Sequence, residues 1–300
     1  MQARVVLVSN PRSSNYRKVE RQVLMPLKQL TENLIEYKIV HTFFEDNVQR
    51  ISRLLREGDT VIAAGGDGTV AIAINAIMAT GFTSITFGAL AYGNFNDLST
   101  AFSGRGAKVE QLLATRRTVK FWPLDIFVNG EHFRYSTMYA DIGLVAGSVN
   151  EFEKGPERRR LRNGWANQLL SFMALVPYYR KHKKTYQLPS SNLGDECTDF
   201  FAINGSRMAK FKVGPGFSGG DRFGTAMLDT RSLLRNIPFA TRSIFGKMPL
   251  SKVKGSELEF KNPAKLDFQA DGEYRKLEGV KKLSFTKPAK HINLIKLTEK

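Results

Sequence analysis

Residues 61–69 read Val-Ile-Ala-Ala-Gly-Gly-Asp-Gly-Thr, and this stretch decides the fold of the first part of the chain. An apolar run typical of a buried strand ends in two glycines, and a helical pattern begins at Val70. Glycine lets the backbone approach a phosphate closely, and the first turn of a helix directs N–H groups toward an anion. Because a carboxylate repels phosphate, we expect Asp67 to hold Mg²⁺ or a water molecule. An ordinary strand–helix turn with a chance aspartate is the alternative.

Strand-like and helix-like patterns alternate through the first third of the chain. The strand-like runs cover residues 4–9, 37–42, 60–64 and 84–87. The helical patterns cover residues 16–34, with an interruption near Pro26, 46–56 and 69–79. Such alternation predicts a doubly wound, mostly parallel α/β sheet with helices on both faces. Ligands bind beyond the carboxyl ends of such strands, so the segments at Asn10, Thr42, Gly65 and Gly93 are expected to form one nucleotide site.

From about Thr118 the pattern changes to short strand-like runs separated by turn signals. These runs cover residues 119–122, 125–128, 132–138, 185–188, 200–203, 258–260, 266–270 and 283–286. Short strands at this spacing predict an antiparallel β-sandwich. The fold class expected for the whole chain is therefore α/β plus all-β.

The glycine motif Gly65-Gly66-Asp67-Gly68-Thr69 resembles the signature of the diacylglycerol kinase catalytic family, which includes bacterial lipid kinases and sphingosine kinases. NAD kinases and phosphofructokinases share a related motif. Four further matches follow in chain order: Asn10-Pro11-Arg12-Ser13-Ser14, Gly93-Asn94-Phe95-Asn96-Asp97, Leu124-Asp125 and Gln269-Ala270-Asp271-Gly272-Glu273. The resemblance spans the chain. It implies a nucleotide-binding domain over residues 1–122, a lipid-substrate β-sandwich over 123–287, and a return of about residues 288–300 to the first domain.

The resemblance implies an ATP- and Mg²⁺-dependent kinase that transfers the γ-phosphoryl group to a hydroxyl of a membrane lipid such as diacylglycerol. The candidate nucleotide contacts are Asn10, Pro11, Ser13, Thr42, Gly65, Gly66, Asp67, Gly68, Thr69, Gly93, Asn94 and Asn96. The carboxylates expected to hold the metal are those of Asp67, Asp97 and Asp125. In the family, the late aspartate is the general base, so Asp271 is the candidate base, and Glu273 would support either this base or the metal. By local sequence alone, Asp271-Gly272 favours a hairpin turn.

Several departures from the family pattern affect the nucleotide motifs, including Phe95 in place of a small residue and Ser14 in place of glycine. Ile72 stands where the family has glutamate, and Asn94 stands where it has threonine. A non-catalytic nucleotide- or lipid-binding relative and an NAD-kinase-like enzyme for a soluble acceptor therefore stay open as alternatives. The four histidines, His41, His132, His182 and His291, do not have metal-ligand spacing and are expected to be structural or solvated.

The chain is strongly basic, with 45 Lys and Arg against 28 Asp and Glu and a net charge of +17. This excess favours a polyanionic partner, either an anionic membrane or a nucleic acid. No nucleic-acid recognition motif is present, so no nucleic acid is expected as a partner. Residues 156–184 place basic ends around an aromatic middle, which suits a helix on an anionic membrane surface. A helix that covers the sandwich with its apolar stripe is the alternative.

The composition also bears on the compartment. The single cysteine, Cys197, fits a reducing cytoplasm, and the N-terminal residues show no signal-peptide pattern. The apolar runs are too short to span a bilayer. A cytoplasmic protein that associates peripherally with membranes is therefore expected.

Overall fold

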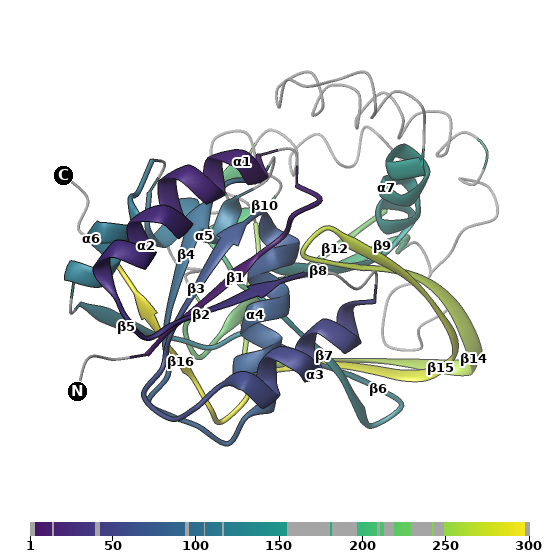
Figure 1. The fold of residues 1–300 in the computed structure, drawn as a ribbon. Helices are drawn as coiled ribbons and strands as arrows, with labels where there is room; N and C mark the ends of the chain where they lie inside the picture. Colours follow the sequence, from purple (N-terminus) through teal and green to yellow (C-terminus); the bar gives the residue numbers. More distant parts are fainter. Residues whose placement is uncertain are drawn as a thin grey trace. The chain divides into compact units, whose positions relative to one another are not determined.

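The computed structural model describes residues 4–13, 15–39, 43–93, 96–104, 106–115, 117–154, 181, 197–208, 211–212, 219–229, 242 and 249–297. The chain divides into two compact units, which are drawn in Figure 1. Unit 1 comprises Met1–Pro123, Ser218–Gly220 and Pro288–Lys300, and unit 2 comprises Leu124–Phe217 and Asp221–Lys287. The predicted strand at 185–188 and the predicted membrane segment at 156–184 lie outside the described residues, apart from Lys181.

Unit 1 is built around a six-stranded sheet of order β2-β1-β3-β4-β16-β5. Its strands are β1 (Val5–Ser9), β2 (Leu34–Lys38), β3 (Thr60–Gly65), β4 (Thr86–Ala91), β5 (Thr118–Phe121) and β16 (Ile292–Ile295). Every neighbouring pair is parallel except β16 with β5, which is antiparallel. The prediction of a mostly parallel α/β sheet is confirmed.

Helices cover both faces of this sheet. They are α1 (Tyr16–Val19), the π-helix η1 (Glu20–Leu24), α2 (Met25–Leu30), α3 (Phe44–Leu54), α4 (Asp67–Ala79), α5 (Asp97–Phe102) and α6 (Val109–Ala114). The consecutive residues Val5, Val6, Leu7 and Val8 are all buried, as expected when both faces of a strand are covered. Ten of the thirteen residues of α4 are buried, so this helix is apolar on every side and lies inside the unit.

Several sequence-based boundaries in unit 1 are wrong: the strand expected at 84–87 is β4, which ends four residues later, and the helix expected at 46–56 is α3, which begins two residues earlier. The helix expected to continue to residue 34 ends at Leu30, because Thr31 is extended and its Oγ1 accepts a hydrogen bond from the Asn33 N–H, 3.2 Å away. The next strand is therefore Leu34–Lys38, three residues earlier than predicted at its start. Pro26 does not break the helix. It lies in the first turn of α2, after the π-helix η1, where a missing N–H costs little.

Unit 2 contains an eight-stranded antiparallel sheet of order β13-β12-β9-β8-β14-β15-β6-β7. Its strands are β6 (Leu124–Val128), β7 (Glu131–Ser136), β8 (Tyr139–Gly143), β9 (Asp199–Ile203), β12 (Phe223–Leu228), β13 (Ser251–Val253), β14 (Gly255–Ala270) and β15 (Glu273–Thr286). The unit also holds α7 (Leu144–Lys154) and the strand pair β10 (Arg207–Met208) and β11 (Phe211–Lys212). The antiparallel all-β second part of the fold is confirmed.

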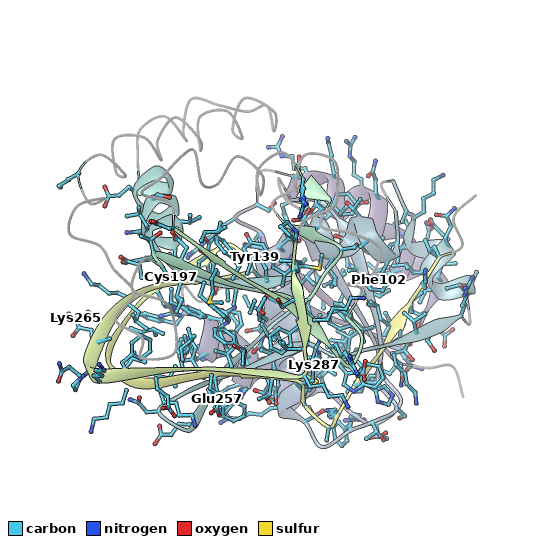
Figure 2. All side chains as sticks on the ribbon, turned by 180° about the vertical axis from the view of Figure 1, so that it is seen from behind. Phe102, Tyr139, Cys197, Glu257, Lys265 and Lys287 are labelled. Carbon is cyan, nitrogen blue, oxygen red and sulfur yellow. The ribbon has the colours of Figure 1, made fainter. Side chains whose placement is uncertain are left out.

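The sheet of unit 2 curls around one apolar core. Its two long strands, β14 and β15, bend together along their length in Figure 1. Lys265, labelled in Figure 2, lies at this bend, beside the register shifts between Glu259 and Leu266. The curl lets Leu258 and Phe268, from opposite halves of β14, contribute to the same core cluster.

The runs predicted at 258–260 and 266–270 are thus one strand, and the run at 283–286 is the end of a 14-residue strand. The exposed residues between the first two runs, Lys261, Asn262, Pro263 and Lys265, concealed this continuity in the sequence. Among the described residues, no helix combines the length and the apolar character that crossing a membrane requires.

Candidate functional site

The glycine motif forms the turn from β3 into α4, as its sequence predicts. Gly66 is the N-cap of α4, and its carbonyl oxygen accepts hydrogen bonds from the N–H groups of Thr69 and Val70 at 3.0 and 3.2 Å. A Cβ at Gly65 would lie 2.4 Å from Thr69 Oγ1, so this position excludes a side chain. No described side chain caps α4. An uncapped helix start behind a glycine turn is the arrangement that anion sites use.

The turn after β4 lies directly against this motif. A Cβ at Gly93 would lie 2.2 Å from the Gly66 Cα, so the two backbones are in contact. The Asn96 side chain fixes the turn by accepting a hydrogen bond from the Gly93 N–H at 2.9 Å and donating one to the Gly93 carbonyl at 2.7 Å. The Asp97 N–H donates to Asp67 Oδ1 at 3.0 Å. Two motifs that are about thirty residues apart are therefore joined at one edge of the sheet.

The segment after β1 makes a tight turn near this edge. The Asn10 carbonyl accepts a hydrogen bond from the Ser13 N–H at 3.0 Å, and Asn10 Oδ1 accepts one from the Arg12 N–H at 3.0 Å. Asn15, which the sequence analysis did not single out, donates from Nδ2 to the Tyr92 carbonyl at 2.9 Å and so connects this segment to the β4 turn. The remaining predicted contacts at this edge, Thr42 and Asn94, lie outside the described residues.

The three predicted metal carboxylates divide between the two units. Asp67 and Asp97 adjoin one another in unit 1, where Asp97 is buried at the start of α5. Asp125 lies on β6 of unit 2. In the described part of the chain, no group of three or more His, Cys, Asp or Glu side chains has a metal-binding arrangement. Mg²⁺ commonly takes only one or two carboxylates and completes its coordination with water and phosphate oxygens.

Asp125 belongs to a cluster with two aromatic side chains of β7. Its Oδ1 lies 2.8 Å from His132 Nδ1, and the ring centroids of His132 and Tyr135 are 4.5 Å apart. Burial, together with the negative charge of Asp125, raises the pKa of Tyr135 to about 12. The sequence analysis assigns His132 no specific partner, whereas in the structure the buried carboxylate of Asp125 orients its imidazole.

Asp271 lies in the tight turn that joins β14 to β15. Asp271 and Gly272 have φ angles of 51° and 84°, as a two-residue type I′ turn requires. The carboxylate is buried and faces the β7–β8 connection. Oδ2 accepts a hydrogen bond from the Thr137 N–H at 2.6 Å, and Oδ1 accepts one from the Met138 N–H at 2.8 Å. The Tyr139 N–H and the Ser136 hydroxyl lie 3.4 and 3.2 Å from Oδ1.

Glu273, the second residue of the predicted catalytic pair, contacts the same connection from the other side of the turn. Its Oε2 accepts a hydrogen bond from Arg134 Nη1 at 3.0 Å, and Arg134 is buried. Asp271 and Glu273 thus both tie the end of the long hairpin to the end of β7. Asp-Gly predicts the turn locally, but nothing in the sequence indicates Arg134 or residues 136–139 as its partners.

Comparison with known proteins agrees with this geometry. Residues 4–126 match the diacylglycerol kinase catalytic domain. Through this segment, the chain is similar to the diacylglycerol kinase catalytic domain family. A curated relative, the mitochondrial acylglycerol kinase of Xenopus laevis, is 31% identical over 126 residues, which cover 39% of this chain and 29% of the relative. The chain therefore aligns with less than a third of that relative's length.

Solved structures described as diacylglycerol kinases from Bacillus anthracis str. Sterne have the same fold. Two of them superimpose with TM-scores of 0.68 and 0.69 at 16% sequence identity, and each alignment covers 98% of this chain and 97% of the other. At this identity the likeness is one of fold. Within the diacylglycerol kinase pattern, Ile72 replaces a glutamate and is buried on α4, so it belongs to the apolar interior of unit 1.

Proposed function

We propose that this protein is an ATP- and Mg²⁺-dependent lipid kinase that phosphorylates a hydroxyl of a membrane lipid such as diacylglycerol. The observation that carries the proposal is the joining of the Gly65–Thr69 and Gly93–Asp97 motifs, with Gly66 against Gly93 and Asp97 bonded to Asp67. The match of residues 4–126 to the diacylglycerol kinase catalytic domain supports the same reaction class.

The residues of unit 1 suit a nucleotide phosphate and Mg²⁺. The glycine turn would present backbone N–H groups to the phosphates, and Asn10, Pro11 and Ser13 would flank them. Asp67 and Asp97, and in the family pattern Asp125, would hold Mg²⁺ directly or through water. Bound Mg²⁺ supplies positive charge that offsets the charge of the phosphates.

Asp271 is the proposed base that accepts the proton of the lipid hydroxyl. Its Oδ2 accepts one hydrogen bond in the described structure, from Thr137, and an anionic carboxylate oxygen offers two acceptor sites. The second site is where a substrate hydroxyl would bind. Glu273, held by Arg134, would keep the turn that carries Asp271 in place.

The proposed partner surface is an anionic membrane, and the proposed location is the cytoplasm, with peripheral membrane attachment. The net charge of +17 supports this, because a basic residue near an anionic leaflet contributes about 1 kcal/mol to binding. Residues 156–184 remain the predicted contact segment on sequence grounds.

The test is transfer of ³²P from γ-labelled ATP into mixed micelles that contain diacylglycerol, sphingosine, ceramide, undecaprenol or phosphatidylglycerol, with NAD as a soluble acceptor. Label in one lipid that falls strongly in Asp271→Asn establishes the lipid kinase and identifies its substrate. Label in NAD alone assigns the protein to the soluble-acceptor kinases. No label, from a protein that binds Mg-ATP, favours either an acceptor outside this panel or the non-catalytic alternative.

A further inference from the structure

Behind the Asp271 carboxylate, unit 2 contains a buried chain of hydrogen bonds that begins at a lysine. Lys287 directly follows β15, and its Nζ donates a hydrogen bond to Asn204 Oδ1. Asn204 is fully buried, and its Nδ2 donates to the Thr137 carbonyl oxygen at 2.9 Å. Lys287, where the chain of hydrogen bonds begins, and Tyr139, next to the segment on which it ends, are labelled in Figure 2. Neither Lys287 nor Asn204 belongs to any motif in the sequence.

The backbone of Asn204 and Gly205 also holds the Thr137–Tyr139 segment in place. Both N–H groups donate to the Met138 carbonyl oxygen, at 2.7 and 2.9 Å. A Cβ at Gly205 would lie 2.2 Å from Met138 Cε, so the β9 end packs tightly on this segment. The Met138 side chain is itself buried. Thr137 and Met138 are therefore held both by hydrogen bonds and by close packing.

Because a peptide group is planar, these contacts determine the direction of the N–H groups that bind the Asp271 carboxylate. The Thr137 carbonyl and the Met138 N–H belong to one rigid peptide plane. The carbonyl of that plane is held by Asn204, and its N–H donates to Asp271 Oδ1 at 2.8 Å. The next plane is arranged in the same way, since its Met138 carbonyl is held by the Asn204 and Gly205 N–H groups and its Tyr139 N–H lies 3.4 Å from Oδ1.

We propose that Lys287 and Asn204 are positioning residues for the Asp271 carboxylate, acting through the two peptide planes that hold it. Lys287 fixes the Asn204 amide, the amide fixes the Thr137–Met138 plane, and the plane fixes the direction of the carboxylate. The catalytic consequence rests on the proposed function, in which Asp271 is the base. Burial lowers the pKa of Lys287 to about 7, against the opposing charge of Asp221, as expected for an amine enclosed by protein.

Lys290 provides a matched control. It lies three residues further along the chain and is also partly buried, and burial lowers its pKa as well. Its Nζ donates to the Ile77 and Thr80 carbonyl oxygens at 2.7 Å each, at the end of α4, and not to the Asp271 network. Lys290→Met therefore reports the cost of losing a buried lysine without disturbing residues 136–139.

The experiment compares Lys287→Met, Lys287→Arg and Lys290→Met in the phosphoryl-transfer assay and by hydrogen exchange. Lys287→Met is expected to lower kcat roughly 10- to 100-fold with little change in KM, because a misplaced catalytic group slows the chemical step. Lys287→Arg, which keeps a cationic N–H donor, restores much of the rate. Lys290→Met leaves kcat near that of the wild type.

A double variant separates positioning from general loss of structure. If Lys287 acts through Asp271, Lys287→Met adds no further loss of kcat to Asp271→Asn. The proposal would be overturned if the loss of kcat in the double variant equalled the product of the two single losses. An unchanged kcat in Lys287→Met would overturn it as well. If the wild type phosphorylates no acceptor, the proposed function fails and hydrogen exchange alone decides. Faster exchange of the Thr137–Tyr139 amides in Lys287→Met, but not in Lys290→Met, supports the positioning role, and unchanged exchange refutes it.

Discussion

Gly93 shows how a single residue sets the geometry of the candidate nucleotide site. The Gly93 and Gly66 backbones are so close that a Cβ added at Gly93 would lie 2.2 Å from the Gly66 Cα. Gly93→Ala is therefore expected to push the two turns apart, lowering the free energy of unfolding by about 1–3 kcal/mol. ATP affinity should fall at the same time.

Thermal unfolding and calorimetric titration with Mg-ATP measure the two effects of Gly93→Ala. Gly81→Ala is the control, because an added Cβ there meets nothing within 4 Å. The control should stay within about 0.5 kcal/mol of the wild type, as exposed substitutions usually do. Full ATP affinity in Gly93→Ala would show that the contact between the turns is irrelevant to binding.

Asp141 on β8 makes stability depend on pH. The residue is 2% exposed, and burial, with a smaller effect of the Asp199 charge, raises its pKa well above 3.8. A raised pKa in the folded state means that folding favours the protonated form. The contribution to stability is complete below about pH 3.8 and is lost as pH rises through the folded-state pKa.

Asp141→Asn should remove this loss, because asparagine carries no charge at any pH. The variant's melting temperature, relative to that of the wild type, is therefore expected to rise as pH increases above about 4. Glu278→Gln changes an exposed acid and is the matched control. Parallel pH curves for Asp141→Asn and the wild type would contradict the expectation.

The β14–β15 hairpin combines a structural and a proposed catalytic role in one element. Its turn residue Asp271 accepts backbone hydrogen bonds from Thr137 and Met138, so the hairpin end is attached to the β7–β8 connection. Asp271→Asn replaces one acceptor oxygen by an amide N–H₂ group. This change is expected to cost about 1–3 kcal/mol of stability and to lower kcat roughly 10²- to 10⁴-fold, which leaves a measurable residual rate.

Gly279→Ala separates the two effects. Gly279 lies on β15 with φ +69° and open space around its Cα, so alanine there should cost about 1–2 kcal/mol through backbone strain alone. Chemical denaturation and the ³²P assay, run on both variants, should show similar losses of stability and a loss of kcat only in Asp271→Asn. A wild-type kcat in Asp271→Asn would exclude Asp271 as the base.

At this scale, the sequence predicts local features well and distant partners poorly. The Asp271-Gly272 turn follows from two residues with a known preference for positive φ, and the structure contains it. The catalytic role of Asp271 remains a prediction. Its hydrogen bonds to Thr137 and Met138 join residues more than 130 positions apart, and no local pattern encodes such a pairing.

The glycine turn was predictable for a different reason. Its glycines are required by contacts within one strand–helix unit, as between Gly65 and Thr69. The residues that explain the turn are therefore neighbours in the sequence. The extent of β14 was not predictable, because its exposed stretch between Phe260 and Leu266 includes Pro263 and reads as a break. The register shifts at this point accommodate the proline within the strand.

The net charge of the whole molecule, without reference to any one residue, predicts how the protein binds to membranes. With a net charge of +17, the protein is expected to bind anionic vesicles at low ionic strength and to be released as salt shortens the Debye length from about 10 Å at 0.1 M to about 3 Å at 1 M. Sedimentation with phosphatidylglycerol vesicles measures this, and phosphatidylcholine vesicles are the control. Equal binding to both, or tighter binding to an oligonucleotide, would contradict a membrane partner.

The position of β16 has a consequence for how the protein is made. This strand lies between β4 and β5 in the sheet of unit 1, and β5 pairs with no other described strand. A ribosome synthesises residues 124–287 before it reaches Ile292, so the N-terminal sheet must wait for its fifth strand until the whole of unit 2 has been translated. During that interval β4 presents an open edge to solvent, where chaperones or unwanted strand pairing would compete for it.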